Sequence, residues 1–165
     1  MLVPLRCLIS RVRDREHGSV AVEAAIIFPF FVLLVFGVVD FGHAWYMKQT
    51  INNASREGAR YGARYWIAGE TRIIPNALNP SISDYVLNTA ADNGGNGGVG
   101  LKSSLPGDAN PTVPTPSGTG YTNATAGNPL SVTVTATKNW WIVNKFIPGM
   151  GSSITISSTT CMAVE

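Results

Sequence analysis

Cysteine, histidine and charged residues are all scarce in this chain of 165 residues. The two cysteines, Cys7 and Cys161, lie far apart, which excludes a disulfide framework and a cysteine-based metal site. Two histidines are present, and neither belongs to a recognisable Ser/His/Asp or Cys/His set. Charged side chains make up 13% of the residues, and residues 19–165 carry eight basic and eight acidic side chains. This part of the chain is formally neutral, so nothing indicates the basic patch of a nucleic-acid-binding protein. We therefore expect no enzyme activity, no cofactor, no metal and no nucleic-acid partner.

A long apolar run near the N-terminus is the strongest signal in the sequence. Residues 24–39 hold no charge, and with residues 19–23 and 40–42 they reach the roughly 20 residues that a helix needs to cross a bilayer. Arginines before such a helix keep that end in the cytoplasm, and residues 1–17 contain four of them. The run exceeds the about 7–15 apolar residues of a cleaved secretory signal. We predict a retained transmembrane helix over residues 19–42, with residues 43–165 outside the cytoplasm.

Glu23 places a carboxylate near the entrance of this run, where a charge is costly. If the chain is cut after Gly18, Ser19 gains an α-amine that is mostly protonated at neutral pH. In a bundle of such helices, that amine can neutralise Glu23 of a neighbouring subunit. The alternative is an ordinary signal anchor in which Glu23 lies at the level of the lipid headgroups.

A helical pattern continues beyond the apolar run, so we expect one helix over Ser19–Trp66, kinked at Pro29, which lacks a backbone donor. Residues 43–66 form its amphipathic extension. On one face of the extension, small residues recur every four positions and allow another backbone to approach closely. That backbone belongs to a neighbouring subunit or to the protein's own sheet, and the two interpretations are compatible. The small residues are Ala54, Gly58 and Gly62.

The polar face of the extension carries Arg56, Glu57 and Arg60. Arginines four positions apart repel each other, whereas Glu57 can pair with Arg60 three positions on. This face is either simply solvated or a candidate partner surface for another subunit or an acidic patch.

Residues 67–165 are expected to form a domain with one short helix and two strands. Ser81 or Ser83 can cap a helix within residues 81–91, and residues 93–129 are a loop rich in glycine and proline. Its Gly-x-Gly-x-x-Gly run at 95–100 lacks the flanking strand and helix of a dinucleotide site. Apolar and polar residues alternate in 130–137 and 154–164, which predicts two strands that pair antiparallel beneath the long helix.

Two features of the C-terminal part have open interpretations. Trp140 and Trp141 form either a plug folded back into the core or an exposed patch at the membrane surface or on a partner subunit. Cys161 is either a buried small hydrophobic residue or a free thiol for intermolecular pairing.

Three pieces of the sequence resemble the TadE-like pseudopilin family: residues 18–25, then Pro29 with residues 37–42, then residues 54–60. Asp40 stands where glutamate is more usual in that family. Its members are minor pilins of the tight-adherence, or Flp pilus, machinery. The resemblance covers residues 11–66 and implies that residues 1–18 are a basic prepilin-type leader, removed after Gly18 by a prepilin peptidase.

The resemblance also implies an α+β, pilin-like fold in which a long N-terminal transmembrane helix with an amphipathic extension packs on a small antiparallel sheet. It implies a single-pass protein of the bacterial inner membrane that supports pilus assembly, adhesion or secretion. The implied partners are the prepilin peptidase, other minor pilins or the major Flp pilin, the inner-membrane assembly platform and membrane lipid. The alternative is an uncleaved, signal-anchored envelope protein whose outer domain, residues 67–165, binds a ligand.

Overall fold

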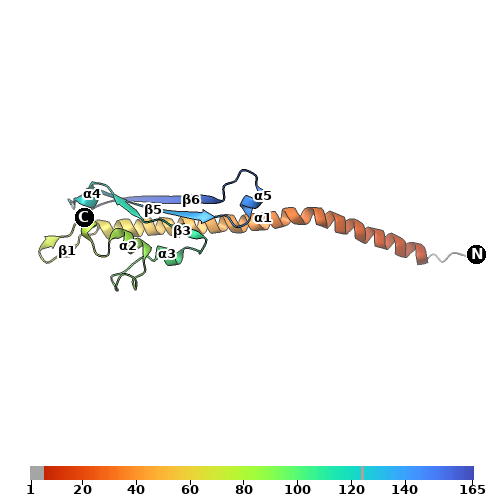
Figure 1. The fold of residues 1–165 in the computed structure, drawn as a ribbon, viewed down its shortest axis with the longest axis horizontal. Helices are drawn as coiled ribbons and strands as arrows, with labels where there is room; N and C mark the ends of the chain where they lie inside the picture. The colour runs from red at the N-terminus through yellow and green to blue at the C-terminus, as the bar shows by residue number, and fades with distance from the viewer. Residues whose placement is uncertain (1–5, 124) are drawn as a thin grey trace, which may run out of the picture.

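A computed structural model of the protein describes the backbone of residues 6–123 and 125–165, and the side chains of 18–123 and 125–165. The arginine side chains of the predicted leader and Cys7 lie outside the described side chains. One helix, α1 (Arg6–Ala63), dominates the molecule (Figure 1). Its 58 residues correspond to roughly 87 Å at about 1.5 Å per residue.

Helix α1 ends at Ala63, three residues before the predicted end at Trp66. The Trp66 indole Nε1 donates to the Tyr61 carbonyl at 2.9 Å, and the backbone N–H of Glu165 donates to the Ala63 carbonyl at 3.0 Å. These bonds satisfy carbonyls that the last turn of a helix leaves without partners. The C-terminus of the chain therefore closes the end of α1.

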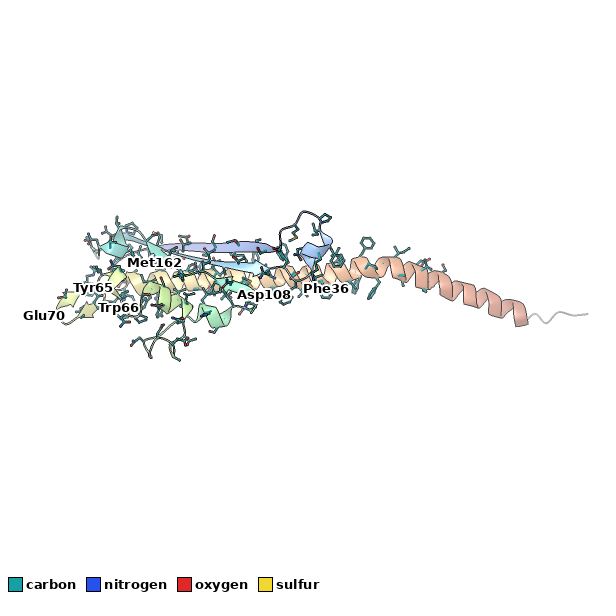
Figure 2. The ribbon with its side chains drawn as sticks, viewed as in Figure 1. Phe36, Tyr65, Trp66, Glu70, Asp108 and Met162 are labelled. Atoms are coloured by element: carbon teal, nitrogen blue, oxygen red, sulfur yellow. The ribbon has the colours of Figure 1, made fainter. Side chains whose placement is uncertain are left out.

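The N-terminal half of α1 stands free of the rest of the protein (Figure 1). No residue from 18 to 39 is buried, and α1 is long and apolar enough to span a membrane. The helix bends on the N-terminal side of Phe36 (Figure 2), where it contains Pro29. Since proline lacks a backbone donor, it explains this bend. By length and composition, α1 is an N-terminal membrane anchor for a single-pass protein.

The C-terminal half of α1 is covered on one side by a small antiparallel sheet. Strands β5 (Pro129–Asn139) and β6 (Ser153–Ala163) pair over their full length, as the alternating pattern predicted. Two short strands, β3 (Ala109–Pro111) and β4 (Thr115–Ser117), pair with the other edge of β5. The even-numbered residues of β5 from 130 to 138 are buried against α1.

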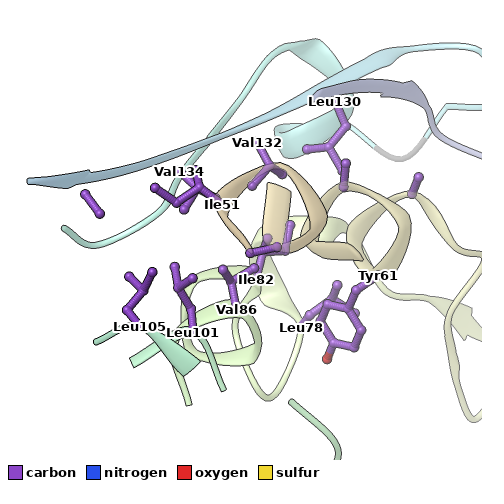
Figure 3. Close-up of a cluster of buried hydrophobic side chains, with 14 of the residues drawn as sticks. Ile51, Tyr61, Leu78, Ile82, Val86, Leu101, Leu105, Leu130, Val132 and Val134 are labelled. Carbon is purple, nitrogen blue, oxygen red and sulfur yellow. The ribbon is translucent and has the colours of Figure 1, made fainter. Parts of the chain in front are cut away.

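The opposite side of α1 is covered by two short helices, α2 (Ile82–Leu87) and α3 (Leu101–Ser104). Figure 3 shows α1 between these helices and the sheet, with Ile51 of α1 lying between Val134 and Val86 of the two flanking layers. Ser81 caps α2, because its hydroxyl oxygen accepts a hydrogen bond from the backbone N–H of Asp84 at 3.1 Å. Ser81 is one of the two serines that were predicted as the cap. We call α1 from Asp40 onward, together with residues 64–165, the C-terminal domain.

Short elements also lie where the sequence predicted only loop. Within residues 93–129, α3, β3, β4 and α4 (Thr119–Thr122) are each three or four residues long. Such elements are too short to leave a readable hydrophobic period. The remaining elements are β1 (Ile67–Ala68), β2 (Thr71–Arg72), the 3-10 helix η1 (Pro75–Ala77) and α5 (Val143–Phe146). The architecture as a whole confirms the predicted α+β, pilin-like fold.

Candidate functional site

A buried ion pair lies where α1 leaves the C-terminal domain. Asp40 of α1 is 1% exposed and Lys138 of β5 is fully buried. The Lys138 Nζ lies 3.4 Å from Asp40 Oδ1 and 3.4 Å from Asp108 Oδ2, and it donates to the Asn139 carbonyl at 3.1 Å. Lys138 is thus a cation between two carboxylates that come from different parts of the chain.

Asp40 also holds the segment that follows β5. Its carboxylate oxygens accept the backbone N–H groups of Trp141, Ile142 and Val143 at 3.4, 3.2 and 3.3 Å. Hydrogen bonds to a charged acceptor are the stronger kind. Three donors and one ammonium therefore compensate Asp40 for leaving water, as a buried charge requires.

Aromatic rings complete this site. The Lys138 Nζ lies 5.2 and 5.3 Å from the ring centroids of Trp140 and Trp141, within cation–π range. The His43 ring lies 4.9 Å from that of Trp141, and its Nδ1 lies 3.6 Å from Asp108 Oδ2. We call these six residues the junction: Asp40, His43, Asp108, Lys138, Trp140 and Trp141.

The sequence does contain a signal for the junction, in the polar residues Lys138 and Asp40 at positions where an apolar residue is expected. Lys138 is the last of the inward-facing residues of β5, and all the remaining residues of that series are apolar. A lysine at such a position needs a buried partner. Asp40, a carboxylate at the end of the apolar run, is the residue of opposite charge that could have been predicted as its partner. The two tryptophans fit neither of their two interpretations completely. Trp141 packs over the junction with one face of its ring, yet 48% of the residue remains exposed.

The stripe of small residues packs inside the protein itself. Ala54 and Gly58 are buried, and a Cβ added at Gly58 would lie 2.5 Å from Val86 Cγ2. A Cβ added at Gly62 would lie 2.5 Å from Ile82 Cδ1 and 2.7 Å from Leu130 Cδ2. In the structure, the small residues of the stripe therefore allow the protein's own sheet and α2 to pack closely against α1.

Gly62→Val is expected to destabilise the C-terminal domain by about 1–3 kcal/mol, the usual cost of overpacking a filled core. Valine would also gain a few tenths of a kcal/mol in helix propensity over glycine, which is too little to compensate. Chemical denaturation of the full chain in detergent measures the difference. Gly42→Val is the matched control, because a Cβ at Gly42 meets nothing within 4 Å. Equal stability of Gly62→Val and the wild type would contradict the packing described here.

Tyr61 anchors the same face of α1 to α2. Its hydroxyl donates to the Pro80 carbonyl at 2.9 Å, and its ring stacks on that of Tyr85 at 4.0 Å between centroids. Burial raises the pKa of Tyr61 above its ordinary value, with a smaller contribution from Tyr85. The phenol therefore stays neutral and keeps donating at physiological pH.

The other predicted site residues lie on the surface. Gly18, Ser19, Glu23 and Pro29 are exposed on the free part of α1. On the extension, Arg56 and Arg60 are exposed and Glu57 is half-buried, and no ion pair between Glu57 and Arg60 is among those of the described side chains.

Two further observations concern Cys161 and the side chains that could bind a metal ion. Cys161 is an exposed free thiol on β6, opposite Ser131, so of its two interpretations the structure excludes the buried hydrophobic residue. Among the residues that the structure describes, no three His, Cys, Asp or Glu side chains are arranged to hold a metal ion.

Comparison with known proteins identifies the N-terminal part of this architecture. Residues 18–60 match the family model described as TadE-like protein. This segment is a TadE-like domain. The resemblance drawn from the sequence is confirmed, and with it the connection to the tight-adherence system. Neither a curated protein nor a solved structure matched the chain.

The TadE-like segment begins at Gly18, the predicted cleavage site, and runs through Asp40 and His43 to Arg60. Lys138, Asp108 and the two tryptophans lie beyond it. The junction therefore joins the TadE-like helix to a sheet that the family match does not cover.

Proposed function

We propose that this protein is a minor pilin, or pseudopilin, of a tight-adherence (Flp-type) pilus or secretion apparatus. It is cleaved after Gly18 and held in the bacterial inner membrane, with its N-terminus in the cytoplasm and its C-terminal domain outside. The observation that carries the proposal is the TadE-like match, which begins at the glycine that precedes the proposed cut.

The distribution of burial along α1 supports the same proposal. Residues 18–31 are exposed and, apart from Ser19 and Glu23, apolar or glycine, so this stretch of the helix has no partner among the residues that the structure describes. Residues 47–63 of the same helix supply much of the domain core. A subunit built this way can pack its free helical half against lipid before assembly and against other helices afterwards, without changing the fold of its domain.

Sequencing the N-terminus of protein purified from its own host, with a functional prepilin peptidase present, tests the proposal. We expect the chain to begin at Ser19. A chain that begins at Met1 would instead favour an uncleaved, signal-anchored envelope protein with an outer ligand-binding domain.

The proposed partners follow from these steps of cleavage, membrane insertion and assembly. The prepilin peptidase acts first, and the inner-membrane assembly platform then brings the subunit to other minor pilins or the major Flp pilin. The candidate partner surface on α1 includes Arg56 and Arg60, which are exposed beside the half-buried Glu57. Pilus assembly, adhesion or secretion would depend on these contacts.

Glu23→Val is expected to leave membrane insertion intact, because it removes a charge from the apolar segment. Assembly should fall, because the Ser19 amine of a neighbouring subunit would lose its counter-charge inside the low-dielectric helix bundle. The measurements are the amount of the variant in the membrane and its co-purification with partner pilins. Glu70→Val, which removes an exposed carboxylate far from the membrane helix, is the control. Wild-type assembly by the Glu23 variant would assign Glu23 to the headgroup level of an ordinary anchor.

A further inference from the structure

An apolar groove lies between α1 and the segment that folds back over it. This segment, residues 140–150, contains α5 and is called the α5 segment below. The groove has a volume of about 440 Å³, and every residue that lines it is apolar or glycine. Leu34, Val38 and Phe41 form the wall on α1, and Val143, Ile147 and Met150 form the wall on the α5 segment.

The groove reaches into the part of α1 that is predicted to span the membrane. Leu34 to Phe41 are the last two turns of the predicted span over residues 19–42, within about 12 Å of its end at about 1.5 Å per residue. The hydrocarbon core of a bilayer is about 30 Å thick, so this wall lies within one leaflet, on the side of the C-terminal domain. Figures 1 and 2 show α5 beside α1 close to Phe36, at the point where the free half of the helix begins.

The exposed side chains of the α5 segment suit the boundary between lipid tails and headgroups. Phe146 is 61% exposed, Ile147 is 47% exposed, and Trp141 is similarly uncovered. The segment has one charged residue, the exposed Lys145. Tryptophan and lysine are typical of membrane interfaces, where an apolar body is buried and a polar end reaches the headgroups.

We infer that the α5 segment is a second membrane-contacting element, which lies in the leaflet next to the C-terminal domain and holds a phospholipid acyl chain in the groove. The groove continues the exposed apolar surface of the anchor helix, so lipid that surrounds the helix also meets the groove. Lys145 supplies a cation for the phosphate of the headgroup. The hydrogen bonds from the α5 segment to Asp40 fix the segment at this depth.

A photoactivatable phospholipid tests this inference directly. The full chain is reconstituted into vesicles of phosphatidylethanolamine and phosphatidylglycerol that contain phosphatidylglycerol with a diazirine in its acyl chain. After irradiation, lipid adducts are located by peptide mass spectrometry. We expect adducts on residues 140–150 as well as on the exposed residues of α1, and none on β6.

A double variant, Phe146→Ser with Ile147→Ser, provides the decisive comparison. Both side chains are largely exposed, so the fold should survive, while adducts on the α5 segment should fall several-fold. Val113→Ser, at an exposed apolar residue that does not line the groove, should leave them unchanged. The inference is overturned if wild-type adducts are confined to α1, or if the double variant keeps them.

The groove could instead receive the helix of a second subunit. In that case a bifunctional cross-linker would join residues 140–150 of one copy to α1 of another, and lipid adducts on the α5 segment would be missing. This result would overturn the lipid assignment. Because the vesicles contain neither peptidase nor pilus machinery, the outcome is independent of the proposed pilin function.

Discussion

Lys138→Met should lower the free energy of unfolding of the C-terminal domain by about 3–5 kcal/mol, the cost of removing one partner from a buried ion pair. The substitution keeps most of the side-chain volume but leaves Asp40, which is 1% exposed, and Asp108 without the cation between them. Asp40 would keep its three backbone donors, which cannot neutralise its charge. Denaturant unfolding of the full chain in detergent, followed by tryptophan fluorescence, measures the loss.

Lys145→Met is the matched control, because Lys145 is exposed and is expected to change stability little. A second test combines Lys138→Met with Asp40→Asn. Since the two residues contact each other, the double variant should lose less stability than the sum of the two single variants. If Lys138→Met is as stable as the wild type, the junction does not hold the domain on its helix.

Gly18→Leu should abolish processing, so that the variant accumulates at full length while the wild type is shortened by 18 residues. A prepilin peptidase must accommodate the residue before the cut, and a leucine side chain would crowd its active site. The protein's own structure has room for the change, because a Cβ at Gly18 meets nothing within 4 Å. Leucine is also a better helix former than glycine, by about 0.8–1 kcal/mol.

The helix adds a second reason for this effect. Gly18 lies inside α1, and a bond inside a hydrogen-bonded helix must leave the helix to enter a protease active site. Glycine weakens the helix at this position and leucine would strengthen it. Gly42→Leu, another exposed glycine of α1 with nothing within 4 Å of its Cβ, should be processed normally. N-terminal sequencing and gel mobility report both results, and a shortened Gly18→Leu chain would refute cleavage after Gly18.

The main elements of the fold could be predicted because each has a local pattern. The apolar run and the helical spacing after it predicted α1 to within three residues of its C-terminal end. The period of two in residues 130–137 and 154–164 predicted β5, β6 and their antiparallel pairing. In each case the residues that carry the signal are close together in the sequence.

The junction could not be derived in the same way, because its members are far apart. Asp40 and Lys138 are separated by 98 positions, and Asp108 lies in a stretch with no hydrophobic period. The exposure of Cys161 follows from the alternation in β6. Cys161 is an odd-numbered residue, on the face opposite that of Ile156 and Met162, and the odd-numbered residues of this strand are exposed.

The unbroken passage of α1 from the anchor into the core has a mechanical consequence. A domain that is joined to its anchor helix by a flexible linker can tilt and move over the membrane independently of the helix. Here the anchor helix itself runs through the domain, and the junction braces the two at the exit point. A force applied to the sheet is transmitted along the helix axis, so lifting the domain by one helical turn draws about 5.4 Å of helix out of the bilayer. The domain and the anchor helix would move together as one rigid unit, with the domain at a fixed height and a fixed rotation relative to the helix.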